Sequence, residues 1–258
     1  MPRGNRYFVP GQIYHLTHRC HNRQFLLRFA HDKNAYRKKL REAVSEFELA
    51  LLDYCQTSNH VHLLAFAEET EQISGFMQMV EGEFAQSYNR RKHRSGAYWD
   101  DRFHSTTIQS GQHLVECMTY IALNMGRCGV VQHPREWDWC GYHELMGFRK
   151  RFRVLDITTL LSLLACDDIS DFRRQYEWRL NEKIARSVMA REPRWTEAIA
   201  VGSESFVRQI ATLIKGRQSL EITGEGENWS LKEGETSYHV PHRVNHKESR
   251  SFQWDEAP

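Results

Sequence analysis

The chain has 258 residues, of which 40% are hydrophobic and 26% charged, and its formal net charge is +2. These values are ordinary for a soluble globular protein, long enough for one domain with an appendage or for two small domains. No apolar run reaches the ~18 to 20 residues of a membrane span, and no apolar signal core follows the first arginines. The cysteines include no Cys-x-x-Cys pair. We therefore expect a cytoplasmic protein with reduced cysteines and no membrane contact.

The first part of the chain alternates predicted strands and helices. Hydrophobic periodicity predicts strands at 13–19, 49–54, 60–66 and 104–109, and helices at 32–47 and 71–91. This βαββαβ order indicates an α+β fold, a ferredoxin-like or RNA-recognition-like antiparallel sheet with its helices on one face.

The third predicted strand carries the most informative motif, Ser58-Asn59-His60-Val61-His62. Alternation along the strand places His60 and His62 on one face and Val61 on the other, so the two imidazoles can share one divalent metal ion. Because a lone His-x-His is short and common, two half-exposed sheet histidines are the alternative interpretation.

Basic residues gather in two clusters. Residues 1–41 contain Arg19, Arg23 and many other cations against the single acid Asp32. The second cluster is Arg90, Arg91, Lys92, Arg94 and Arg102, interleaved with Tyr88, Tyr98, Trp99 and Phe103. Cations can follow a phosphate backbone while aromatic rings stack on bases, so the clusters predict binding of single-stranded nucleic acid. The alternative is a solvated helix end followed by a loop whose aromatic residues pack in the core.

A helix predicted between Ser110 and Gly129 presents a polar stripe. Its members recur every three or four residues: His113, Glu116, Tyr120, Asn124 and Arg127. A tyrosine at the centre of such a stripe suggests a chemical role, although a residue at the rim of an amphipathic helix gives the same pattern.

Combined, these residues suggest phosphodiester chemistry. A metal ion held by His60, His62 and the amide oxygen of Asn124 would have further coordination positions open for water and phosphate oxygens. This suits Mg²⁺ or Mn²⁺ better than structural zinc. Tyr120 then supplies the nucleophile, with Arg127 among the cations that stabilise it. Glu116 is a solvated helix residue in the favoured interpretation, and a metal ligand or proton acceptor in the alternative.

The remainder of the chain is predicted to be an extension of a 1–150 domain. Residues 151–215 look helical, and the predicted helices 195–201 and 203–214 loosely resemble a helix-turn-helix that binds DNA or simply packs. Glycine, serine and glutamate accumulate later, so residues 216–258 are expected to form a disordered polar tail.

Several spaced blocks resemble the REP-associated tyrosine transposases, single-strand insertion-sequence enzymes with a His-hydrophobic-His motif and one catalytic tyrosine. The blocks are 58–64, 95–103 and 120–129, and the segments around His15 and Trp137 also fit. The resemblance implies Tyr120 as nucleophile, His60 and His62 as metal ligands, and cutting of single-stranded DNA through a 5′-phosphotyrosine link and a free 3′-hydroxyl. After Asn124 the chain reads 125–129 as Met-Gly-Arg-Cys-Gly, where the family commonly has Pro-Val-Arg-Ala-Gly.

Other functions compete with this one. Two His-x-Thr units, His15 to Thr17 and His104 to Thr106, would suit a metal-free two-histidine phosphoesterase. A histidine-triad hydrolase is disfavoured because Leu64 occupies the place of the third histidine. The alternative that is not an enzyme is a domesticated transposase, which binds hairpin DNA without cutting it. The sequence is compatible with a monomer or a homodimer.

Overall fold

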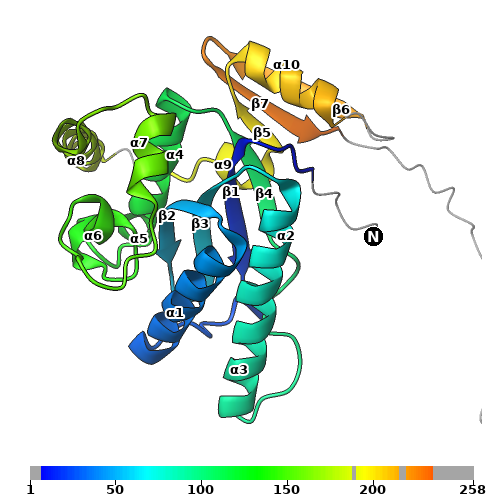
Figure 1. The fold of residues 1–258 in the computed structure, drawn as a ribbon, viewed down its shortest axis with the longest axis vertical. Helices are drawn as coiled ribbons and strands as arrows, with labels where there is room; N and C mark the ends of the chain where they lie inside the picture. The colour runs from blue at the N-terminus through cyan, green and yellow to red at the C-terminus, as the bar shows by residue number, and fades with distance from the viewer. Residues whose placement is uncertain (1–6, 188–189, 215–218, 235–258) are drawn as a thin grey trace, which may run out of the picture.

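A seven-stranded sheet lies at the centre of the computed structural model, which describes residues 7–187, 190–214 and 219–234 (Figure 1). Its strand order is β2-β3-β1-β4-β5-β7-β6. The first four strands are β1 (Gln12–Arg19), β2 (Ala50–Gln56), β3 (His60–Ala67) and β4 (His104–Ile108). Both β3 and β4 pair antiparallel with β1, and β2 pairs antiparallel with β3. The predicted ferredoxin-like arrangement of an α+β fold is confirmed for this part of the sheet.

One face of the sheet is covered by the helices predicted from periodicity. These are α1 (Ala30–Phe47) and a second helical rod made of α2 (Thr70–Gln78), the π-helical turn η2 (Met79–Glu83) and α3 (Phe84–Arg91). Val61, Leu63 and Ala65 of β3 lie in the same buried cluster as Leu40 of α1 and Phe76 of α2. The alternating apolar residues of the strand thus fix which face the helices cover.

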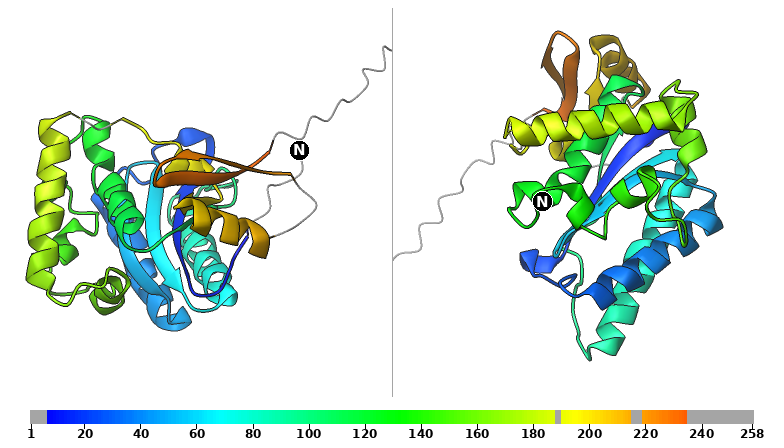
Figure 2. Two further views of the ribbon diagram at one scale, coloured as in Figure 1. Left: turned by 90° about the horizontal axis from the view of Figure 1, so that it is seen from above. Right: turned by 90° about the vertical axis from the view of Figure 1, so that its left-hand side faces the viewer.

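The second face is covered as well, so the prediction of helices on one face only is wrong. Its helices are α4 (Gln112–Ala122), α5 (Asn124–Arg127), α6 (Tyr142–Leu145), α7 (Ile157–Leu163) and α8 (Ile169–Ala185). Leu64 and Ile108 of the sheet pack in one cluster with Leu114 and Ile121 of α4. In Figure 2, α4 and α8 lie on the opposite side of the sheet from α1 and α2. The apolar residues that follow His62 on its own face need this cover.

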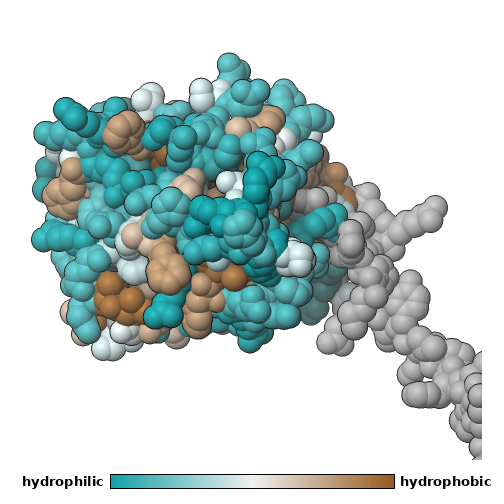
Figure 3. All heavy atoms as spheres, turned by 90° about the horizontal axis from the view of Figure 1, so that it is seen from below, coloured by the Kyte–Doolittle hydropathy of each residue, from teal (hydrophilic) through white to brown (hydrophobic). Residues whose placement is uncertain are grey.

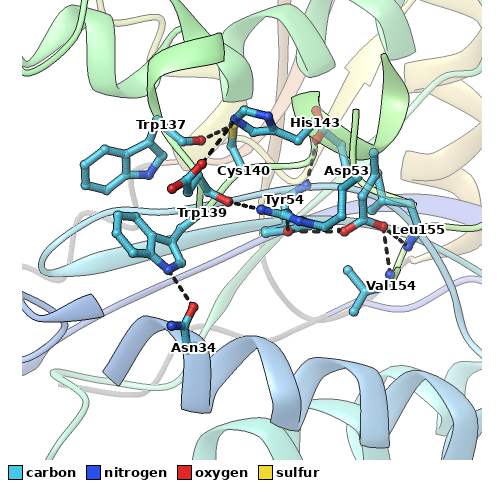
Figure 4. Close-up of polar contacts among 12 residues, drawn as sticks. Asn34, Asp53, Tyr54, Trp137, Trp139, Cys140, His143, Val154 and Leu155 are labelled. Carbon is cyan, nitrogen blue, oxygen red and sulfur yellow. Dashed lines mark hydrogen bonds and ion pairs between the residues drawn. The ribbon is translucent and has the colours of Figure 1, made fainter. Parts of the chain in front are cut away.

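The segment after α5 is bonded to the edge strand β2. Gln56 N donates to Trp139 O (2.9 Å) and Gly141 N donates to Tyr54 O (2.8 Å). The indole Nε1 of Trp139 donates to Asn34 Oδ1 of α1 (3.0 Å), as Figure 4 shows. Through these bonds the segment 139–141 connects the edge strand β2 to helix α1.

The extension after residue 150 differs from its prediction. A short helix, α9 (Arg194–Glu197), is followed by the strand β5 (Ala200–Gly202) and then by α10 (Glu204–Leu213). Because β5 pairs parallel with β4, the residues expected to form a helix at 195–201 are partly a buried strand, and no helix-turn-helix is formed. The apolar run 198–201 explains this outcome, since a fully buried strand and a short buried helix have the same composition.

The expected disordered tail is wrong for residues 219–234, which form a hairpin. Strands β6 (Leu220–Glu225) and β7 (Asn228–Glu233) pair with each other, and β7 pairs with β5. Leu231 is fully buried against Val207 and Ile210 of α10, so the few apolar residues of this segment are enough to attach it. The later part of the predicted tail lies outside the described residues.

Composition also led to expectations about membrane-spanning helices and about the state of the cysteines. None of the described helices has both the length and the hydrophobicity needed to cross a membrane. The cysteines are free thiols, most of them buried, whereas Cys128 is exposed.

Candidate active site

A cavity of about 570 Å³ opens where β3 begins, beside the C-terminal end of α4. The residues that were predicted for the site and line this cavity are Arg19, His60, His62, Arg102, Tyr120, Asn124 and Arg127. They come from β1, β3, the loop before β4, α4 and α5. The fold therefore brings the histidine strand and the tyrosine helix to one place.

His60 and His62 lie on one face of β3, as alternation predicts, with ring centroids 5.0 Å apart. His60 Nδ1 donates to Asn59 Oδ1 (2.8 Å), and Thr57 Oγ1 lies 2.9 Å from the same nitrogen. A proton on Nδ1 leaves the Nε2 lone pair of His60 available. The turn before the strand thus sets the tautomer of the first histidine.

A line of hydrogen bonds sets the tautomer of His62. Trp195 O lies 2.7 Å from His15 Nδ1, and a carbonyl can only accept, so His15 Nδ1 carries the proton. His15 Nε2 must then accept from His62 Nδ1, which lies 2.9 Å away. At the other end of the line, His62 Nε2 accepts from Asn124 Nδ2 (2.8 Å). The His62 lone pair is therefore directed at Asn124, on the cavity side.

All three histidines are neutral at pH 7 for the same physical reason. Burial, helped by the neighbouring Arg19, lowers the pKa of His60 to about 4. Burial also lowers the pKa of His15 to about 3 and holds the pKa of His62 well below its usual value. A neutral imidazole is the form that binds metal ions.

The donors suit a metal ion that keeps part of its own hydration shell. Among the described residues, no three His, Cys, Asp or Glu side chains are grouped to hold a metal, so the candidate ligands are two imidazoles and the Asn124 amide. Since Asn124 Nδ2 now faces His62 Nε2, binding requires the amide to turn its oxygen inward. Three protein donors leave positions for water and phosphate oxygens.

Tyr120 is almost completely buried at the centre of this arrangement. Its ring centroid lies 6.0 Å from that of His62, and the guanidinium carbon of Arg127 lies 4.0 Å from the Tyr120 ring centroid. Burial raises the pKa of Tyr120, while Arg127 and Arg191 act in the opposite direction. The hydroxyl is therefore protonated at neutral pH and needs nearby cations to become a nucleophile.

Arg127 combines two features of an anion-binding side chain. It lines the cavity, and its buried Nη2 has no hydrogen-bond partner among the described residues. An unpartnered guanidinium donor is costly unless an anion binds it. Arg127 thus has a donor available for an oxyanion beside the Tyr120 ring.

The other two members of the predicted polar stripe lie outside the cavity lining. His113 Nε2 donates to Glu227 O (2.8 Å), and Glu116 pairs with Arg194 (3.3 Å). Both residues connect α4 to the C-terminal part of the chain. In this structure Glu116 is an ion-pair residue.

The basic clusters divide into cavity, surface and structural residues. Arg23, Arg90 and Lys92 are exposed outside the cavity. Arg91 pairs with Asp32, and Arg94 donates to Ala97 O (2.7 Å) and so holds its own loop. Seen from below, the end of the molecule where α1 begins and α3 ends is largely hydrophilic (Figure 3).

The aromatic residues of the second cluster are not a stacking surface, and this prediction is wrong. Tyr88, Tyr98 and Phe103 are 8%, 3% and 4% exposed, respectively. The Trp99 ring stacks on His18 with centroids 4.0 Å apart, and its Nε1 donates to Glu81 O (3.0 Å). These side chains fill the core beneath the loop, as the alternative interpretation required.

The sequence did not predict the contribution of the segment just before β5. Arg191 and Thr196 line the cavity, and Trp195 is fully buried with its ring 6.3 Å from that of Tyr120. In the sequence, His15 was noted only as part of a segment that fits the family resemblance and of a competing motif, and no role in the site was assigned to it. Its period-two spacing with Thr17 and Arg19 on β1, next to β3, was the available signal for a place beside His62.

Comparison with known proteins agrees with the fold and with the resemblance. Residues 8–124 match the family described as "Transposase IS200 like". A putative REP-associated tyrosine transposase of Haemophilus influenzae is 23% identical over 120 residues, which are 43% of this chain and 68% of that protein. The resemblance drawn from the sequence is confirmed.

Two solved structures are similar to the chain. A REP-associated tyrosine transposase bound to a REP hairpin is 16% identical with a TM-score of 0.51, covering 61% of this chain and 96% of that one. A putative transposase from Deinococcus radiodurans is 20% identical with a TM-score of 0.32, covering 40% and 83% of the two chains. The first of these confirms the fold.

Proposed function

We propose that this chain, whose residues 8–124 match the IS200-like transposases, is a metal-dependent transposase that binds hairpin DNA and cuts single-stranded DNA through a tyrosine. The observation that carries the proposal is the meeting of Tyr120, two neutral imidazoles and the unpartnered Arg127 donor in one cavity. The hairpin substrate is proposed because the structural relative is bound to a REP hairpin.

The reaction assigned to Tyr120 is an in-line displacement at phosphorus. The Tyr120 oxygen forms a bond to the phosphorus, and the bond from phosphorus to the 3′-oxygen breaks, which gives a 5′-phosphotyrosine and a free 3′-hydroxyl. The phenol loses its proton to water as it attacks, and the leaving 3′-oxygen takes up a proton from water. Arg127 stabilises the developing phenolate and the phosphate charge.

The metal would be held by His60 Nε2, His62 Nε2 and the oxygen of Asn124. When bound, Mg²⁺ or Mn²⁺ polarises the phosphodiester and offsets charge on its oxygens. Arg19 and Arg102 at the cavity rim add positive charge for the neighbouring phosphates.

The two-histidine phosphoesterase fits the geometry less well. His15 is fully buried and both of its ring nitrogens are bonded within the protein. A general acid or base must reach the substrate directly or through one water. Neither ring nitrogen of His15 is therefore available as a general acid or base toward a substrate.

The test is incubation with labelled single-stranded hairpins, with and without Mg²⁺ or Mn²⁺, followed by a denaturing gel that detects a covalent adduct. Tyr120→Phe should abolish the adduct and leave DNA binding nearly intact, because it removes only the nucleophilic oxygen. Tyr142→Phe is the matched control, since Tyr142 is a buried tyrosine of α6 outside the cavity lining, and it should keep the adduct. Adduct formation by Tyr120→Phe would refute the assignment. Binding without any adduct in the unmodified chain would instead support a non-cleaving hairpin-binding protein.

A further inference from the structure

Two phenylalanines project from the loop between β1 and α1. Phe25 is 67% exposed and Phe29 is 57% exposed. We propose that these two rings are a stacking platform for unpaired bases of the DNA strand that leads into the cavity. This inference rests on the proposed function, because it assigns the single-stranded substrate a path over the surface.

The loop is fixed to the walls of the cavity. Cys20 N donates to Asn59 O (2.7 Å) and Leu27 N donates to Ser58 O (2.9 Å), in the turn directly before His60. Asn22 N donates to Oδ1 of Asp100 (3.2 Å), which lines the cavity. The two rings are therefore carried by a braced loop next to the cavity mouth, so little conformational entropy is lost when bases bind.

The surroundings of Phe29 are cationic. The guanidinium carbon of Arg28 lies 5.8 Å from the Phe29 ring centroid, and Lys92 Nζ lies 5.6 Å from it. Asp32 is the only acid among residues 20–41, and it is paired with Arg91. A polyanion that also offers flat rings complements this surface, whereas an apolar protein partner would have to desolvate the cations.

The aromatic residues first considered for stacking on bases are in the core. Stacking on a bound single strand would therefore require other aromatic side chains. Tyr88, Tyr98 and Phe103 cannot reach a base without unpacking the sheet face that they cover. Phe25 and Phe29 meet the requirement without any rearrangement.

Phe152 provides a matched control. It is 68% exposed and has Arg41 5.1 Å from its ring centroid, so its residue type, exposure and cation resemble those of Phe29. It lies in the segment that packs beside β2, whose Asp156 N donates to Leu51 O (2.8 Å), and it is not part of the cavity lining. If exposed phenylalanines bound DNA indiscriminately, Phe152 would contribute as much as Phe29.

The experiment measures affinity for a fluorescein-labelled thymidine oligonucleotide and for a duplex of the same length over a series of salt concentrations. Phe25→Ala and Phe29→Ala should each weaken single-strand binding roughly tenfold without changing the salt slope, because stacking releases no counterions. Phe29→Trp should restore binding, and Phe152→Ala should have no effect. Replacing Arg28 and Lys92 with glutamine should reduce the salt slope by about 0.7 for each cation that contacts phosphate.

Two outcomes would overturn the proposal. One is single-strand affinity of the Phe25→Ala and Phe29→Ala variants equal to that of the unmodified chain, and the other is an equal loss of affinity for duplex DNA. The adduct assay separates this proposal from the proposed function. Normal adducts with unchanged affinity refute the platform alone, whereas weaker binding by the phenylalanine variants of a chain that forms no adduct supports the platform and refutes the cleavage.

Discussion

The two faces of strand β1 hold buried histidines in different ways. On the α1 side, His18 Nδ1 lies 2.9 Å from Glu81 Oε1, and His18 Nε2 lies 2.7 Å from the Tyr36 hydroxyl. On the α4 side, His15 has no carboxylate partner in the described part of the chain, and it begins the hydrogen-bonded line that runs through His62 to Asn124. Both ring nitrogens of His18 are bonded to side chains of the helical layer, although His18 also borders the cavity. The line from His15 ends at the cavity, where the His62 Nε2 lone pair is directed at the Asn124 amide. Burial is common to all three histidines, so the comparison depends on their hydrogen-bond partners: His18 is bonded to a carboxylate and a phenol, whereas His62 is bonded to another histidine and to an amide.

The largest expected effect separates the two faces directly. His62→Ala should abolish Mn²⁺ binding by the DNA-free protein and lower the proposed metal-dependent cleavage by at least ~100-fold, because one of the three proposed ligands is lost. His18 also borders the cavity, but both of its ring nitrogens are bonded to Glu81 and Tyr36, so His18→Gln should leave Mn²⁺ affinity unchanged. It should lower stability by about 1–3 kcal/mol, since Glu81 loses its histidine partner. Full activity of His62→Ala in Mg²⁺ would exclude a shared metal site.

A smaller effect tests whether the line of hydrogen bonds matters to the cavity. His15→Ala removes the acceptor of the His62 Nδ1 proton, so His62 is free to take the other tautomer. We expect Mn²⁺ affinity to fall about 10- to 100-fold, in the range measured for partners of metal-bound histidines. Titration of Mn²⁺ followed by electron paramagnetic resonance measures this without any cleavage assay. Unchanged affinity would mean that the Asn124 contact alone orients His62.

The smallest effect concerns the pH dependence of the metal-free protein. Because burial lowers the pKa of His15 to about 3, the unfolded chain takes up a proton near pH ~6.5 that the folded chain does not. The contribution of His15 to the free energy of unfolding is therefore fully present above that pH, and it decreases as the pH falls toward about 3. Between pH 7 and pH 5 the loss from His15 is about 2 kcal/mol. Urea unfolding of His15→Asn should show a pH dependence that is shallower by this amount, and parallel curves for the two proteins would contradict the prediction.

Much of the fold and of one half of the site was predictable because the signals are local. Period-two alternation placed His60 and His62 together and Val61 opposite, and β3 has that arrangement. Spacing along one helix brought Tyr120 and Asn124 to the same side, and both line the cavity even though α4 stops at Ala122 and α5 begins at Asn124.

The rest depends on contacts between residues far apart in the sequence. Trp195 reaches His15 across 180 positions, and β5 is a strand only because β4 offers it an edge. Exposure was the other unpredictable quantity. Phe25 and Tyr98 both occur among cations in the sequence, yet one is on the surface and the other in the core.

The contact between His15 and position 195 uses the main-chain carbonyl of Trp195. Any amino acid at that position offers the same acceptor, so the hydrogen bond does not depend on the identity of the side chain, although the buried Trp195 ring is itself part of the core. Only an insertion or deletion that shifts the path of the backbone would remove the hydrogen bond. Comparing amino acids position by position would therefore overlook this support of the site, while comparing backbone paths would reveal it. The family match ends at residue 124, whereas the cavity of the proposed active site is also lined by Arg127, Arg191 and Thr196, which lie beyond that boundary.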